Sequence, residues 1–133
     1  MKSRRNFFSF ATAFFLGVIG KAQSQARGEA KELARHALTG PQQGMEAILV
    51  EVTAPPGHSM AHRHPGFVLG YVLDGELQFA INGKRPEIVK AGGTFFEPVG
   101  ALHTTGASAK PDASVKFLAF MVAPKGSPIV LPA

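Results

Sequence analysis

Two histidines separated by one residue are the side chains of this sequence with the clearest capacity for chemistry. On an extended strand His62 and His64 would point to the same face, so that their imidazole nitrogens could share a divalent ion at about 2.0–2.1 Å each. A third ligand must come from elsewhere in the fold, and His103 begins a predicted strand after a Pro-Val-Gly turn. The sequence therefore predicts a metal site at these histidines. It leaves open whether the metal is Fe, Zn, Ni, Cu or Mn.

Three other polar residues have more than one interpretation. His58 lies in a turn four residues before His62, and an exposed turn histidine is favoured over a metal ligand there. His36 is interpreted as incidental. Glu97 stands directly before Pro98, where it is either a candidate catalytic base or a solvated carboxylate, and both alternatives stay open.

The elements that must position these residues are short strands separated by Gly and Pro. Residues 45–53 are rich in β-branched side chains and end at an Ala-Pro-Pro-Gly turn, which predicts a strand. Asp-Gly and Asn-Gly occur between later segments, and two-residue hairpins prefer these dipeptides. Residues 29–38 fit either a short helix or a first strand. The predicted fold class is all-β, with further short strands at residues 67–73, 76–81, 86–89, 94–97, 102–105, 115–122 and 129–131.

Residues 1–26 have the charged, apolar and small-residue order of a cleavable export signal. The apolar stretch at 11–20 is too short to span a bilayer core of about 30 Å, which disfavours a retained transmembrane helix. Ser3-Arg4-Arg5-Asn6-Phe7-Phe8 resembles a twin-arginine motif, although an ordinary secretory signal remains the alternative. Replacing both arginines by lysine would separate the two export routes. The expected location is periplasmic or secreted, with no membrane attachment after cleavage.

Charge and composition exclude several classes of function. The chain carries 14 basic and 9 acidic side chains, but four of the basic ones lie in residues 1–26, so the rest of the chain is nearly neutral. The basic character therefore gives no support for nucleic-acid binding. There is no cysteine, which rules out thiolate chemistry and leaves histidine, carboxylate or backbone oxygen to hold a metal.

The spacing of the histidines with nearby glycines resembles the two motifs of the cupin family. The first motif places a His-x-His pair and a Glu between two glycines, and it is matched here by Gly57, His62, His64 and Gly75. The second motif, Gly-x5-Pro-x-Gly-x2-His-x3-Asn, is matched by Gly92, Pro98, Gly100 and His103. The resemblance covers residues 57–107. It implies a single-domain jelly-roll β-barrel at 45–133, joined by an N-terminal segment at 27–44, with one divalent ion on the three histidines.

The sequence departs from the cupin pattern at three positions. Gly57 is one residue closer to His62 than the motif expects, and Ala107 replaces the closing Asn. Val68 stands where the family has its Glu ligand. An ion held only by neutral imidazoles would keep its full charge, so an anionic further ligand is expected. The predicted cavity lining is Val68, Tyr71, Phe79, Phe96 and Phe117.

Two functions of different classes fit these residues. The first is a metal-dependent, dioxygenase-like enzyme, an oxygenase or isomerase acting on a small anionic organic molecule, because a site of three histidines leaves coordination positions open. The second is a periplasmic protein that binds a metal or small ligand without turnover. A decayed site, with the histidines only filling the barrel, is a further alternative, and a homodimer is among the assemblies that the sequence allows.

Overall fold

The computed structural model describes residues 28–133, and the predicted export signal lies outside the described residues. The described part consists of strands and one 3-10 turn, which confirms the all-β prediction. Residues 29–38, which by sequence fit either a helix or a strand, form a strand over residues 29–37. The elements are β1 Glu29–Ala37, η1 Gly40–Gln42, β2 Met45–Ala54, β3 His62–Arg63, β4 Phe67–Asp74, β5 Glu76–Ile81, β6 Glu87–Lys90, β7 Thr94–Glu97, β8 His103–Ser108, β9 Val115–Pro124 and β10 Leu131–Pro132.

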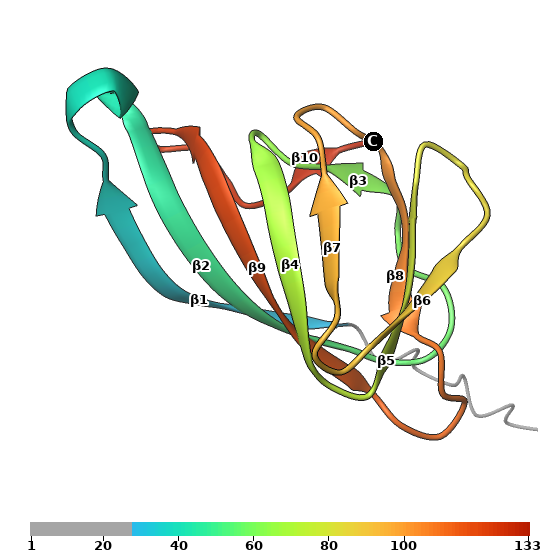
Figure 1. Cartoon of the computed structure of the whole chain (residues 1–133). Helices are drawn as coiled ribbons and strands as arrows, with labels where there is room; N and C mark the ends of the chain where they lie inside the picture. The colour runs from blue at the N-terminus through green and yellow to red at the C-terminus, as the bar shows by residue number, and fades with distance from the viewer. Residues whose placement is uncertain (1–27) are drawn as a thin grey trace, which may run out of the picture.

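These strands form two five-stranded sheets with antiparallel pairing between neighbouring strands (Figure 1). The first sheet has the order β1-β2-β9-β4-β7 and the second has the order β10-β3-β8-β5-β6. The N-terminal segment contributes β1, which pairs with β2 from Glu29↔Thr53 to Ala37↔Glu46 and forms one edge of the first sheet. Within residues 28–133, no helix has the length and apolar character needed to cross a membrane.

The core lies between the sheets because alternate residues of each strand point inward. In β2, Ile48 and Val50 are buried while their neighbours are only half-buried. In β9 the same alternation buries Phe117 and Met121. These side chains join inward residues of β4, β5 and β7 in one apolar cluster, whose members include Val68, Val72, Leu77, Phe79, Phe95 and Val115.

The two dipeptides predicted as hairpin turns have different roles. Asn82 and Gly83 both have positive φ, at 54° and 68°, and they lie in the loop between the paired strands β5 and β6, as the sequence predicts. Asp74-Gly75 is not a hairpin turn, because β4 and β5 belong to different sheets. There Gly75, with φ 83°, carries the chain from one sheet to the other.

Gly70 shows how closely the first sheet packs beneath the cavity. It is buried on β4 directly across the ladder from Phe95 of β7, and a Cβ atom there would lie 2.0 Å from the ring atom Cζ of Phe95. The Phe95 ring thus packs directly on the backbone of the glycine.

We expect Gly70→Ala to destabilise the domain by about 1–3 kcal/mol, because the methyl group must displace a buried ring. The measurement is chemical unfolding followed by circular dichroism. Thr94→Val, an isosteric change at an exposed position of the adjacent strand, is the control and should shift the free energy of unfolding by less than about 0.5 kcal/mol. Equal stabilities for Gly70→Ala and the unmodified protein would show that Phe95 does not occupy this place.

Candidate metal centre

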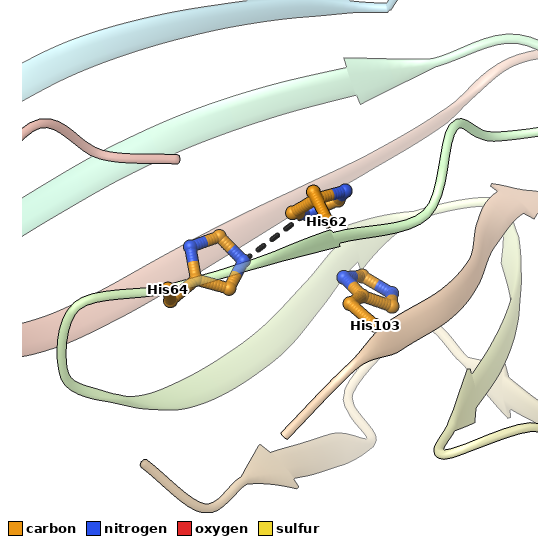
Figure 2. A group of neighbouring side chains, drawn as sticks. All are labelled: His62, His64 and His103. Atoms are coloured by element: carbon orange, nitrogen blue, oxygen red, sulfur yellow. Dashed lines mark hydrogen bonds between the residues drawn. The ribbon is translucent and has the colours of Figure 1, made fainter. Parts of the chain in front are cut away.

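The three histidines meet at one place, as the sequence predicts. His62 on β3 and His103 on β8 are direct partners across an antiparallel ladder of the second sheet. His64 lies just after β3, in the short connection to β4 (Figure 2). One ligand atom from each ring lies within 4.8 Å of the others, which is the arrangement of a group that could hold a metal ion.

Each ring directs one nitrogen to a backbone carbonyl. His62 Nδ1 lies 2.8 Å from the oxygen of Met60, His64 Nδ1 lies 2.7 Å from that of Ile129, and His103 Nε2 lies 2.8 Å from that of Thr105. Carbonyl oxygens only accept hydrogen bonds, so in the neutral rings these nitrogens carry the protons. The other nitrogens, His62 Nε2, His64 Nε2 and His103 Nδ1, are left with free lone pairs. Backbone carbonyls that fix the tautomer in this way are typical of metal-binding histidines.

The free nitrogens of His62 and His64 face each other at 3.2 Å (Figure 2). With both protons committed to carbonyls, no proton lies between these nitrogens, and two lone pairs at this distance repel. Two nitrogens bonded at about 2.1 Å to one ion, with a nitrogen–metal–nitrogen angle of about 90–109°, would lie about 3.0–3.4 Å apart. The residues present therefore fit a divalent metal ion.

A buried carboxylate stands beside the histidines. Glu97 on β7 is only 2% exposed. Its Oε1 lies 3.3 Å from His103 Nδ1 and its Oε2 lies 3.7 Å from His64 Nε2. The expectation that no carboxylate accompanies the three histidines is therefore wrong, and so is the alternative of a solvated Glu97. The cupin motif has its carboxylate at position 68 on β4, where this chain has Val, whereas Glu97 reaches the site from the neighbouring strand β7.

Burial controls the charge of this cluster. It raises the pKa of Glu97 to about 7 and lowers the pKa of His103 to about 4, with the nearby His62 adding to the second effect. Burial also lowers the pKa of His64, against the hydrogen bond to Ile129. The rings of His64 and His103 are therefore neutral at pH 7, and the 3.3 Å contact between Glu97 and His103 is not an ion pair of two charged groups in the metal-free protein.

Local packing fixes the position of His103. Its ring centroid lies 5.4 Å from that of Phe79, and the ring also packs against Gly106. A Cβ atom at Gly106 would lie 2.7 Å from His103 Cε1 and Nε2, so a larger residue would push the ring away. No sequence pattern marks Gly106, because its contact with the histidine depends on how the His103 ring folds back over its own strand.

The free nitrogens and Glu97 open into a cavity of about 920 Å³ between the sheets. Apolar side chains form most of its wall, and within the described residues no Lys or Arg lines it. Its charged lining residues are Glu29 and Glu97. The apolar residues of the wall include Val50, Val52, Ala54, Val68, Phe95, Phe117, Ala119, Ile129 and Val130.

Two of the five predicted lining residues, Val68 and Phe117, line this cavity, whereas the other three, all aromatic, do not. Tyr71 and Phe96 are 46% and 52% exposed, because they point outward from strands β4 and β7. Alternation along a strand requires this, since Val68 and Glu97 point inward. Phe79 does not line the cavity and instead lies behind His103.

The remaining histidines lie outside the cluster. His58 is exposed and lines the rim of the cavity beside Met60, which is 89% exposed. His36 is exposed on the edge strand β1. Neither belongs to the group of histidines that could share an ion.

The raised pKa of Glu97 predicts a pH-dependent stability for the metal-free protein. Below its ordinary pKa of about 4.5 the carboxyl is neutral in both states, and its burial does not lower the stability. As the pH rises from there through the folded-state pKa of about 7, the native state loses stability, because only the unfolded state can ionise the group without cost. When both proteins are unfolded by denaturant in the presence of a chelator, we expect Glu97→Gln to have the same free energy of unfolding as the unmodified protein at about pH 4.5. At about pH 8 its free energy of unfolding should be higher, by on the order of 1–3 kcal/mol. A difference that does not change with pH would mean that position 97 is hydrated.

Comparisons with known proteins bear on the fold and the family. The model of the cupin domain matches residues 50–121, which is more than half of the chain. No curated protein matches.

Solved structures resemble the described fold at low sequence identity. A double-stranded β-helix protein from Klebsiella pneumoniae is 20% identical with a TM-score of 0.62, over 83% of this chain and 88% of that one. A cupin-like protein from Thermotoga maritima is 23% identical with a TM-score of 0.56, over 75% and 77%. The DMSP lyase DddQ from Ruegeria pomeroyi is 22% identical with a TM-score of 0.58, over 90% and 59%. At these identities the likeness shows the fold alone. Together with the match to the family model, it establishes that this chain belongs to the cupin family.

Proposed function

We propose that this cupin is a metal-dependent enzyme that acts on a small anionic organic molecule, as an oxygenase or an isomerase. One observation carries the proposal: three imidazole nitrogens with free lone pairs converge at the wall of a cavity of about 920 Å³. This volume lies within the range of about 300–1,000 Å³ that is typical of small-molecule sites. A structural metal site would be closed by protein ligands, whereas this one opens into the cavity.

His62, His64 and His103 would hold the ion, and a bound divalent ion would supply Lewis-acid activation of a substrate oxygen. The backbone carbonyls of Met60, Ile129 and Thr105 keep the three rings in the tautomer that binding requires. The apolar wall excludes water and strengthens electrostatic interactions at the site.

The lining also restricts the substrate. A dication bound by neutral imidazoles attracts an anionic group, and an ionised Glu97 would offset only part of that charge. Because no Lys or Arg of residues 28–133 lines the cavity, a second anionic group on the substrate would find no partner there. The geometry therefore favours a monoanion with an apolar body, such as an enolate or an aromatic carboxylate.

Binding without turnover is the second candidate. Besides the three histidines and Glu97, the titratable residues that line the cavity among the described residues are His58 and Glu29, and both are exposed. A reaction that needs a separate acid or base deep in the cavity would lack one. Metal analysis of the purified protein, followed by oxygen-uptake and isomerisation assays with enolates and catechol-type acids, separates the candidates. Turnover supports the enzyme, while tight binding without product formation supports the second candidate.

Replacing any one of the three histidines by Ala should lower the metal affinity by about tenfold or more, because each supplies one of the converging nitrogens. His58→Ala is the matched control at the rim, and its metal content should stay within about twofold of the unmodified protein. The measurement is competition with a chromogenic chelator, with folding checked by circular dichroism. Equal losses in all four variants would overturn the assignment of the site to these three residues.

A further inference from the structure

We infer that Glu97 is the fourth protein ligand of the metal, donated by the strand next to the one that carries this ligand in the cupin motif. The inference rests on the proposed metal site. It assigns a position that the motif does not mark, because the motif's Glu corresponds to Val68 on β4.

Strand register makes such an exchange of position feasible. Val68 on β4 and Glu97 on β7 are direct partners across the antiparallel ladder of the first sheet. Direct partners project from the same face with Cβ atoms about 4.5–5.5 Å apart. A carboxylate moved from position 68 to position 97 therefore stays on the inner face of the sheet and still points toward the histidines. The two residues are both 2% exposed, so neither side chain has turned out to solvent.

The contacts of Glu97 match those of a ligand without its ion. Oε1 lies 3.3 Å from His103 Nδ1, within the range of about 3.0–3.4 Å for two donors of one ion, and Oε2 lies 3.7 Å from His64 Nε2, slightly beyond it. Among residues 28–133, the group of ligand atoms that all lie within 4.8 Å of one another contains only the three histidines, so the Glu97 side chain would move toward the ion on binding. Glu97 Oε2 and His103 Nδ1 are buried side-chain atoms that have no hydrogen-bond partner in the part of the chain that the structure describes. Buried polar atoms are rarely left unpaired, so two at the same place point to a missing partner.

That partner must be a cation. A neutral Glu97 carries one proton, which can meet only one of the three free imidazole nitrogens, and an ionised Glu97 carries none, so acceptors face acceptors in either state. Among the described residues, the cavity lining contains no Lys or Arg that could compensate the carboxylate. Several acceptors around one point, with too few protons to join them, form a site for a metal ion rather than a hydrogen-bonded network.

A carboxyl group that packs beside the site without binding the ion is the competing interpretation. Under that interpretation, Glu97→Gln keeps the metal affinity within about threefold, because the amide fills the same space and no bond to the ion is lost. A direct ligand loses its charge in this variant, so we expect the affinity to fall by about tenfold or more. The visible spectrum of the cobalt-substituted protein should change as well, since it reports the donors bound to the ion.

The decisive variant returns the carboxylate to the neighbouring strand. We expect Glu97→Val to bind the metal at least about tenfold more weakly, and the double variant Val68→Glu/Glu97→Val to regain most of that loss. Glu97→Val replaces a buried carboxylate by an apolar side chain, so it should fold in the metal-free state. Glu87→Gln, at an exposed position on β6, is the control for loss of a carboxylate elsewhere and should leave the affinity unchanged.

The outcomes separate this inference from the proposed function. If the unmodified protein binds one ion and Glu97→Val and Glu97→Gln bind it as tightly, Glu97 is not a ligand, although the histidine site stands. A folded double variant that stays as weak as Glu97→Val would contradict the claim that both positions reach the same ion. If the unmodified protein binds no divalent ion at all, the metal site itself is wrong and this inference falls with it.

Discussion

Repulsion between facing lone pairs is the interaction on which the site depends. Three backbone carbonyls take the protons of three imidazoles, and the remaining nitrogens are turned toward one another, with His62 Nε2 and His64 Nε2 3.2 Å apart. In the absence of a cation this arrangement is unfavourable, and the surrounding barrel must hold it in place. A divalent ion would convert that repulsion into four favourable contacts if Glu97 completes the set. The same argument explains why a carboxylate is tolerated at 2% exposure in a mainly apolar cavity.

The barrel supplies this constraint through one pair of partners on each sheet. His62 and His103 are paired on the second sheet, while Val68 and Glu97 are paired on the first. Because the two sheets pack face to face, the inward members of the two pairs meet across the cavity. His64 joins them from the connection between β3 and β4, where the chain passes from one sheet to the other. The ligands are therefore far apart in the sequence but lie on strands whose register is set by the core.

The histidines could be predicted from the sequence because the pattern that marks them involves only residues close together in the chain. A His-x-His pair has only one arrangement on an extended strand, and His103 follows a recognisable turn. The role of Glu97 could not be predicted in this way, since it depends on the register between β4 and β7, which residue types alone do not fix. The outward positions of Tyr71 and Phe96 could have been deduced from alternation, since residues three apart on a regular strand, such as 68 and 71, face opposite sides. The hairpin predicted at Asp74-Gly75 failed because a turn dipeptide does not reveal whether the next strand stays in the same sheet.

The most direct test of the account is a crystal structure of the protein loaded with one divalent metal, with the ion located by anomalous scattering. The account predicts a single ion in the cavity bonded to the three imidazoles and to a Glu97 oxygen, each at about 2.0–2.2 Å, with at least one position open toward the apolar wall. An ion bound at the rim by His58, or a cavity without an ion whose histidines bond only to one another and to Glu97, would contradict it.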